Sequence, residues 1–461
     1  MSEDAPRVMR ALEAKALNAA LWSVVEYGSA MGLRVVSSLV LTRLLLPAYF
    51  GEMILISTLI LGINFLSDIG LTPAVIQSPR GDDPLFLNTA WTLQAMRGVG
   101  LWFIALVISW PMALLYHDPR LKVLLPVLAF STLLSGFYST NLLTLARHLG
   151  VRRLFIIDVS SSLVALAVTI AWACKWPSVW SIIGGQLVAT VYKLCLSHSS
   201  SVAPGIRNSF GWDKPSIDSI VHFGKWILIG TAFFYFASQG DRLILGRLIP
   251  MAVLGMYGIA YQLSDMPRQI MLSLGSRVFY PFIAKIIDLP LEEFRAKFLR
   301  YRFYVLLIGG VLLSIMAVWG NLLILKLYDH RYWYASWMIR ILALGLWHTL
   351  LYQTTAPVLF SLGKPKYNAV GNAAYCVALA AGILVGFHYW RMLGAVIAVA
   401  AGDFPLYLVT LFGATRERIR PLRQDLLMTS IFIAMLLFCA ILRYPHLVSA
   451  PGSIFHHQWA N

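Results

Sequence analysis

The sequence predicts an all-α polytopic membrane protein. Of its 461 residues, 59% are hydrophobic and only 13% are charged, about half the charged share of an ordinary soluble domain. Apolar runs of about 20 residues recur along the whole chain, and each is long enough to cross the hydrocarbon core of a bilayer as a helix. These three observations exclude a soluble enzyme.

Thirteen spans are predicted from the apolar runs and from the charged, Pro-rich or Gly-rich breaks between them. Their approximate bounds are 17–46, 49–77, 88–116, 121–147, 154–174, 177–197, 218–240, 243–284, 296–325, 332–362, 367–388, 392–413 and 425–442. We interpret 243–250 as a turn, so that the eighth span covers 251–284. The tail after Arg443 is short and polar, so one or two helices are predicted after the twelfth span.

The long polar segment 198–217, rich in Ser, Pro and Gly, divides these spans into two sets of six. The predicted organisation is an N-terminal lobe over 1–197 (spans 1–6), a cytoplasmic linker over 198–217, a C-terminal lobe over 218–413 (spans 7–12), and an additional C-terminal span and tail over 425–461.

The two sets also resemble each other. RLLLPAYFG (43–51) recurs as RLIPMAVLG (247–255) with the same Arg-to-Gly spacing, LYHDPR (115–120) is echoed by LYDHR (327–331), and LGVRR (149–153) by LGKPK (362–366). Six spans per repeat place both repeats in the same orientation, which predicts two six-helix lobes related by a pseudo-twofold axis along the membrane normal. This architecture is typical of transporters that work by alternating access.

The formal net charge of +16 is distributed unevenly between the two sides of the predicted membrane. With a cytoplasmic N-terminus, 22 of the 37 Lys and Arg residues fall on the cytoplasmic side and 10 on the other, as the positive-inside rule requires. The remaining five are arginines inside spans, and their charge needs another explanation.

Four segments of the sequence are similar to those of a known family. They are RLLLPAYFGEMILISTLILGINFLSDIGLTPAVIQ (43–77), LARHLGVRRLFIIDVSSSL (145–163), HFGKWILIGTAFFYFASQGDRLILGRLIPMAVLGMYGIAYQL (222–263) and FYPFIAKI (279–286). The chain resembles, from about residue 16 to 413, the bacterial polysaccharide flippases of the multidrug/oligosaccharidyl-lipid/polysaccharide exporter superfamily. Asp241, with Gly246, Arg247 and Gly255, is the most specific part of the resemblance.

The resemblance implies a V-shaped pair of six-helix lobes in the bacterial cytoplasmic (inner) membrane, for surface polysaccharide, exopolysaccharide or lipopolysaccharide biosynthesis. It implies translocation of an undecaprenyl-pyrophosphate-linked oligosaccharide, with membrane lipids and other polysaccharide assembly proteins as partners. Many relatives have fourteen spans, so a thirteen-span chain leaves the position of the C-terminus open.

Two of the arginines inside spans lie on polar helix faces, one in each half of the chain. Arg34 follows Ser23 and Tyr27 on one face of the first span, and Arg268 follows Tyr257 and Tyr261 on one face of the eighth. A guanidinium binds phosphate in a bidentate manner, so we expect both arginines to line a cationic substrate cavity. The alternative is a structural ion pair, such as Arg34 with Glu26 or Arg268 with Asp265.

Three further arginines are candidates for the same cavity. Arg97 and Arg277 could instead reach the cytoplasmic headgroups, and Arg340 shares a face with His348, Tyr352 and Thr355 that could bind sugar hydroxyls.

The acidic residues inside spans are candidates for coupling to H⁺ or Na⁺ or for gating. Glu26, Asp68 and Asp265 could carry a proton, although each could also neutralise a neighbouring arginine. Asp241 is interpreted as a structural or gating pair with Arg242. Asp158 and Asp403 are isolated polar residues without partners in the sequence pattern.

No catalytic, cofactor-binding, metal-binding or nucleic-acid-binding motif is present in the sequence. The sequence therefore predicts a lipid-linked oligosaccharide flippase and no enzyme. One alternative is a cation-coupled drug exporter of the same superfamily, which the arginines inside spans oppose by repelling cationic drugs. The other is an integral-membrane sugar polymerase or ligase, which would need a large outer loop.

Overall fold

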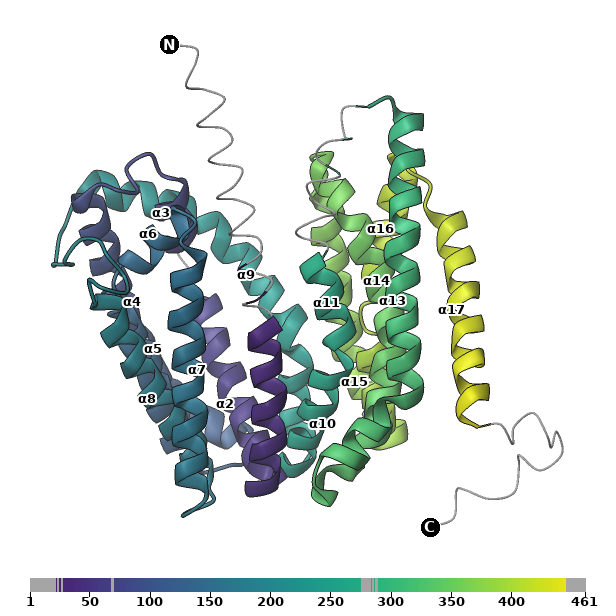
Figure 1. Ribbon diagram of the computed structural model, residues 1–461, viewed down its shortest axis with the longest axis horizontal. Coiled ribbons are helices and arrows are strands. Elements are labelled where there is room, and N and C mark those ends of the chain that lie inside the picture. Colours follow the sequence, from purple (N-terminus) through teal and green to yellow (C-terminus); the bar gives the residue numbers. More distant parts are fainter. Residues whose placement is uncertain are drawn as a thin grey trace. The chain divides into compact units, whose positions relative to one another are not determined.

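The computed structural model describes residues 28–67, 70–274 and 289–444, together with Trp22, Val25, Ile283 and Ile286, and it gives the backbone alone for 219–233 and 273–274. Within these ranges the secondary structure is helical and contains no strand. The chain forms two compact units, residues 1–255 and 256–461 (Figure 1).

The first unit begins, in its described part, with a helix over residues 28–44. It continues with α2 (Pro47–Phe65), α3 (Leu71–Gln77), α4 (Pro84–Leu115), α5 (Leu121–Gly136), α6 (Asn141–Arg147), α7 (Val151–Ala173), α8 (Val179–His198), α9 (Lys214–Leu248) and the first residues of α10 (Met251–Ser264). The long helix α4 packs along α5, α7 packs along α8, and α9 lies against α2, α3 and α4.

Two of the predicted spans in this unit are interrupted. The span predicted over 49–77 ends as α2 at Phe65 and restarts as α3 after Gly70, whose φ of 65° is easily reached by glycine. The span predicted over 121–147 bends by 67° between α5 and α6. Both interruptions are invisible to hydropathy because the segments on either side stay apolar.

The segment predicted as the interdomain linker is bound to the first unit. Asn141 Nδ2 donates to the carbonyls of Ala203 and Ile206, and Asn208 bonds to Ser139 and Thr140. The division between the compact units therefore falls after Gly255, beyond the predicted 198–217 boundary, because α9 packs on the helices that precede it.

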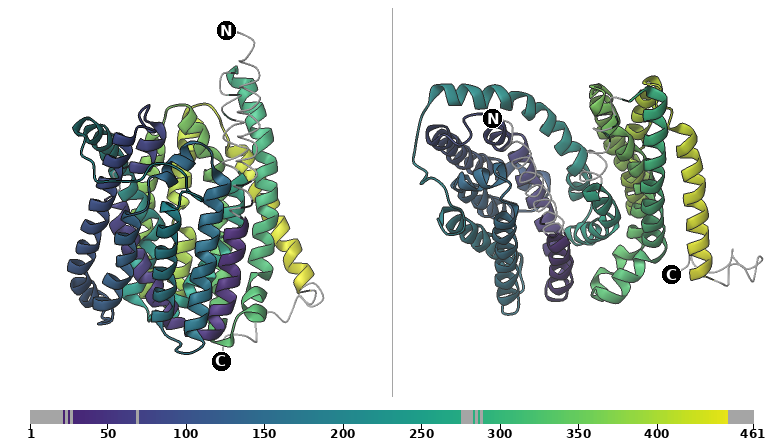
Figure 2. Two further views of the ribbon diagram at one scale, coloured as in Figure 1. Left: turned by 60° about the vertical axis from the view of Figure 1, so that its left-hand side comes forward. Right: turned by 45° about the horizontal axis from the view of Figure 1, so that its top comes forward.

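The described part of the second unit contains seven further elements after α10. They are α11 (Met266–Leu274), α13 (Leu291–Leu327), the 3₁₀ helix η2 (His330–Ala335), α14 (Ser336–Ser361), α15 (Lys366–Ala401), α16 (Phe404–Arg416) and α17 (Leu422–Arg443). A core cluster of Met271, Leu306, Leu313, Trp347, Leu350, Met428 and Phe432 joins α11, α13, α14 and α17. The Trp347 ring on α14 stacks on the Phe432 ring of α17 with centroids 4.3 Å apart, and α17 also packs along α13 (Figure 2).

Helix α15 contains a sharp turn at Trp390 and Arg391, where Arg391 has a φ of 50°. The limbs on either side approach closely, because a Cβ atom on Gly386 would lie 2.5 Å from the carbonyl oxygen of Gly394. Only glycine fits at this contact. The two limbs correspond to the spans predicted over 367–388 and 392–413.

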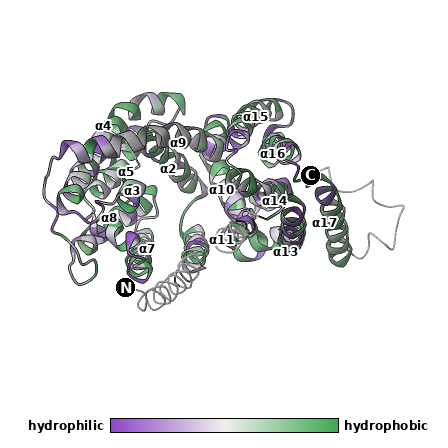
Figure 3. Cartoon of the chain, turned by 90° about the horizontal axis from the view of Figure 1, so that it is seen from above, coloured by the Kyte–Doolittle hydropathy of each residue, from purple (hydrophilic) through white to green (hydrophobic). Residues whose placement is uncertain are grey.

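Among the described residues, seven helical segments are long and apolar enough to cross a membrane, or eight if α5 and α6 form one broken span. One of these is the 51-residue segment Lys366–Arg416, which contains both limbs of the α15 turn. The exposed side chains of α17 are largely apolar (Figure 3). The prediction of an all-α, multi-pass membrane protein is confirmed.

Candidate functional site

A cavity of about 600 Å³ lies in the first unit, lined by helix 28–44, α7, α8 and Tyr138. Its polar lining residues are Arg34, Ser37, Tyr138, Asp158, Ser161, Ser162, Thr169, Gln186, Thr190 and Lys193. A volume of this size is ordinary for a ligand pocket. The mixture of hydroxyl, amide and cationic groups is suited to a ligand that carries both sugar hydroxyls and negative charge.

Arg34 contributes an exposed guanidinium to this cavity, on the first predicted span. Within the part of the chain that the structure describes, Arg34 takes part in no ion pair. Its alternative partner in the sequence, Glu26, lies outside the described residues, as do Asp68 and Arg277.

A second cation and a carboxylate line the same cavity. Lys193 on α8 forms an ion pair with Asp158 on α7, and its ammonium lies 5.6 Å from the centre of the Tyr138 ring. The prediction that Asp158 has no partner is therefore wrong. The sequence did contain a signal for this pair. Asp158 lies near the start of one predicted span and Lys193 near the end of the next, so antiparallel packing of the two spans places both residues at the same depth in the membrane.

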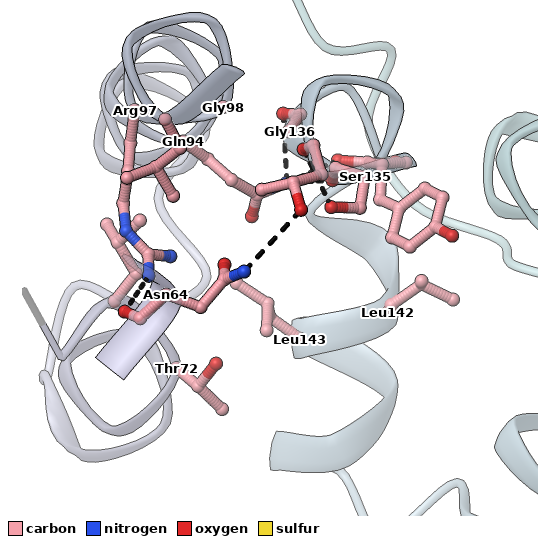
Figure 4. A pocket seen from close by; sticks show the side chains of 14 residues that line it. Asn64, Thr72, Gln94, Arg97, Gly98, Ser135, Gly136, Leu142 and Leu143 are labelled. Carbon is pink, nitrogen blue, oxygen red and sulfur yellow. Dashed lines mark hydrogen bonds between the residues drawn. The ribbon is translucent and has the colours of Figure 1, made fainter. Parts of the chain in front are cut away.

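Arg97 has a different environment, beside a smaller cavity of about 260 Å³ (Figure 4). Its guanidinium donates to the carbonyl oxygens of Asn64 at 2.7 Å and Ser67 at 3.0 Å, at the C-terminal end of α2. Three residues earlier on α4, Gln94 donates to the carbonyls of Ser135, Gly136 and Tyr138 after α5. Both side chains donate to carbonyls at the C-terminal ends of interrupted helices, where regular helical hydrogen bonding ends.

In the second unit, Arg268 lies on α11 and forms a bidentate ion pair with Asp265, with Nη2 2.7 Å from Oδ2. Asp265 is buried at the break between α10 and α11, and Gln269 donates to it at 2.9 Å. The structure thus contains the ion pair that was the alternative to a free cavity arginine. Pro267 follows the break, so the eighth predicted span is interrupted here.

The remaining predicted residues are dispersed. Arg340 donates to the Tyr444 hydroxyl at 2.9 Å, whereas His348 contacts Asp403, so these two residues of the predicted face have different partners. Asp241 is buried in α9, and Arg242 donates to Gln239.

The repeated Arg-to-Gly motifs meet within the first unit. A Cβ atom on Gly51 would lie 1.8 Å from the carbonyl oxygen of Met251, and one on Gly255 would lie 2.0 Å from that of Pro47. The last glycine of each motif copy is therefore required for the contact between the starts of α2 and α10.

The LYHDPR segment joins this contact. The Tyr116 hydroxyl donates to the Leu243 carbonyl at 3.3 Å, and Arg120 pairs with the buried Glu52 at 2.7 Å. A cavity of about 570 Å³ is lined here by Tyr116, His117, Asp118 and residues 246–251. We call residues 47–52, 116–120 and 246–255 the motif junction.

The sequence interpretation missed one large polar network. Arg302, counted among the cytoplasmic residues, is fully buried on α13, with Nη1 2.5 Å from Asp425 Oδ1 on α17. It also donates to Thr354 Oγ1 at 2.9 Å and to the Leu351 carbonyl at 3.0 Å. The hydropathy pattern did not reveal this network, although Arg302 lies about three turns into α13, which begins at Leu291.

The sequence matches the family model described as "Polysaccharide biosynthesis protein" over residues 40–336. The chain is 24% identical over 314 residues to the lipopolysaccharide biosynthesis protein WzxC of Escherichia coli (strain K12), covering 67% of this chain and 63% of WzxC. It thus spans less than two thirds of that relative. It is 22% identical over 348 residues to the succinoglycan biosynthesis transport protein ExoT of Rhizobium meliloti (strain 1021), covering 74% and 68% of the two chains.

Two solved structures are similar in fold. The lipid II flippase MurJ, in an inward closed conformation, matches with a TM-score of 0.68 and 12% identity over 93% of this chain and 99% of its own. An inward-facing multidrug resistance transporter of the MATE family matches with a TM-score of 0.65 and 12% identity over 86% and 96%. The chain therefore has the two-lobe helical fold of these transporters.

Proposed function

The chain belongs to the family of polysaccharide biosynthesis proteins, and from this premise we propose that it is a transporter: a flippase for an undecaprenyl-pyrophosphate-linked oligosaccharide. It moves this lipid-linked repeat unit across the cytoplasmic membrane by alternating access and performs no covalent chemistry. The names of WzxC and ExoT, which refer to polysaccharide biosynthesis and transport, support this proposal.

The observation that carries the proposal is the guanidinium of Arg34 in a polar cavity of about 600 Å³. A charged side chain at the centre of a membrane helix costs about 2.5–3.5 kcal/mol on insertion scales. A bound pyrophosphate offsets this cost, because it accepts bidentate hydrogen bonds from the guanidinium. The surrounding hydroxyl and amide side chains can bind the first sugars while the lipid tail stays in the bilayer.

Arg34, Arg97, Arg268, Arg277 and Arg340 were all candidates for the cationic cavity, and the proposal rests on Arg34. The bidentate contact between Arg268 and Asp265 favours a structural role for that pair. The carbonyl partners of Arg97 favour the same role there.

The orientation follows from the distribution of positive charge. We place the N-terminus and segment 198–217 in the cytoplasm, and polysaccharide assembly proteins are the partners expected at the membrane. A single-cysteine variant at the exposed Ser200 tests this placement. A membrane-impermeant maleimide should fail to label it in intact cells and should label it after permeabilisation.

The function is tested by reconstituting the purified protein in vesicles that contain the lipid-linked oligosaccharide. The expected result is protein-dependent movement of the oligosaccharide between leaflets, measured by its accessibility to a glycosidase added outside. Movement of an organic cation without movement of the lipid-linked substrate would contradict the proposal and favour the drug exporter.

A further inference from the structure

A histidine and an aspartate lie together in the second unit. His348 Nε2 on α14 is 2.5 Å from Asp403 Oδ1, although the two atoms are not aligned for a hydrogen bond. The hydroxyl of Thr349 donates to the other carboxylate oxygen of Asp403. The prediction that Asp403 has no partner is therefore wrong.

Both residues lie at the middle of predicted membrane spans. His348 is twelve residues from the start of α14 and thirteen from its end, or about 18 Å from the start at 1.5 Å per residue. Asp403 lies near the midpoint of the second limb of the α15 turn and α16. An ionisable residue at this depth is costly and is a functional candidate by default.

The helix that carries Asp403 is broken at this residue. α15 ends at Ala401 and α16 begins at Phe404, so Gly402 and Asp403 form a turn between them. A Cβ atom on Gly345 would lie 2.2 Å from the Ala400 carbonyl oxygen, so α14 touches the backbone at the break. Broken helices at the bilayer midplane are a recurring site for coupling ions in transporters.

The ionisable groups around the pair come from four neighbouring helices. On α15, the Tyr375 ring would meet a Cβ atom on Gly402 at 3.1 Å. On α16, the Tyr407 hydroxyl donates to Asp425 of α17, and Asp425 is already paired with Arg302 of α13. Imidazole is the side-chain type that ordinarily exchanges a proton near neutral pH, and His348 supplies it at this site.

The His348–Asp403 pair is not completely buried. The side chains of His348 and Asp403 keep 15% and 18% of their surface exposed, and the Phe404 ring lies edge-on to the imidazole with centroids 5.8 Å apart. The described residues contain no group of three or more side chains able to hold a metal ion, and an imidazole nitrogen is a good acceptor for a proton.

We propose that His348 and Asp403 form a proton-binding site that couples transport to a pH gradient. His348 takes one proton from the aqueous phase on one side of the membrane, which places an imidazolium beside the Asp403 carboxylate. The same N–H bond breaks when the site faces the other side, and the proton returns to water. The coupling rests on the proposed transport function, whereas proton binding at His348 does not.

Coupling is tested in the reconstituted vesicles with the His348→Gln variant and with His388→Gln as the matched control, since His388 is an exposed histidine on α15. With one proton per lipid, a gradient of one pH unit should shift the steady-state leaflet ratio of the wild-type substrate by up to about tenfold. The control should keep this shift, and His348→Gln should flip the lipid with the same ratio at every gradient.

Proton binding is tested without any transport. The difference in Tm between the wild type and His348→Gln, measured in detergent between pH 5 and 8, varies with pH only if His348 titrates in the folded protein. Asp403→Asn should change that pH dependence. A constant difference in Tm would overturn the site, and a pH-gradient response retained by His348→Gln would overturn the coupling. Absence of flipping by the wild type would overturn the proposed function and leave the Tm result to decide the proton site.

Discussion

Arg34 and Arg268 lie on polar helix faces in the two halves of the chain, but their environments differ. Arg34 lines an open polar cavity and forms no ion pair among the described residues, whereas Arg268 is held by both carboxylate oxygens of Asp265. In our proposal, the first unit offers a cation to a ligand, whereas the second unit neutralises its cation internally.

The largest effect is expected at Arg302, the most buried of the arginines that form an ion pair within the protein. Arg302→Leu leaves Asp425 buried without its partner, and removing one member of a buried pair costs about 3–5 kcal/mol. Tm in detergent should therefore fall strongly. Arg300→Leu, an exposed change two residues earlier, should leave Tm nearly unchanged. Replacement of both partners, in Arg302→Met with Asp425→Leu, should recover much of the loss.

The next effect is expected at Arg34. Arg34→Gln removes charge-assisted hydrogen bonds to the pyrophosphate, worth about 1.5–3 kcal/mol, so binding of the lipid-linked substrate should weaken by about 10- to 150-fold. Isothermal titration or a fluorescent headgroup analogue measures this, with the exposed Arg153→Gln as control. Unchanged affinity with intact folding would remove the anion site from this cavity.

Arg268 should respond differently, because its partner is within the protein. Arg268→Gln should impair transport mainly by leaving Asp265 unpaired, so adding Asp265→Asn should restore part of the activity. A coupling energy of about 0.5–3 kcal/mol between the two sites is expected from a double-mutant cycle. If the losses of transport activity in the two single variants simply add in the double variant, Arg268 acts on the substrate directly. Arg268 and Arg34 would then have the same role.

A smaller effect, an increase in affinity for the substrate, is expected from a change at Asp158. Asp158→Asn releases Lys193 from its ion pair and removes the one carboxylate among the described residues that line the cavity. Because partly exposed pairs contribute about 0.2–1 kcal/mol, affinity for the pyrophosphate headgroup should increase by less than tenfold. Weaker binding would mean that Asp158 itself contacts the substrate.

The smallest effect is expected at Arg80, which lies outside the predicted spans. It pairs with Asp83 at 2.7 Å and with Asp213 at 3.2 Å, and its guanidinium holds the pKa of Asp83 below the ordinary value. A lowered pKa in the folded state stabilises the protein at neutral pH, and this contribution is lost as pH falls. The slight decrease in Tm caused by Arg80→Ala at pH 7 should disappear in acid.

The sequence was sufficient for the membrane fold and for placing Arg34 on a polar helix face, because hydropathy and helical spacing are local properties. It was insufficient for the pairs between Lys193 and Asp158, His348 and Asp403, and Arg302 and Asp425, whose members are separated by 35 to 123 residues or lie at helix breaks. Hydropathy also did not predict the helix breaks at Gly402 and Asp265, because the helical segments before and after each break are largely apolar. Glu26, Asp68 and Arg277 stay predictions, because they lie outside the described residues.

The network around Arg302 also has a consequence for biogenesis. Its acidic partner, Asp425, is synthesised 123 residues later, which takes roughly 6–25 s at cellular elongation rates. During this interval α13 must wait in or beside the translocon with an uncompensated cation. A nascent chain that stops before α17 therefore lacks the carboxylate that pairs with Arg302, so this charge is neutralised only when α17 joins α13.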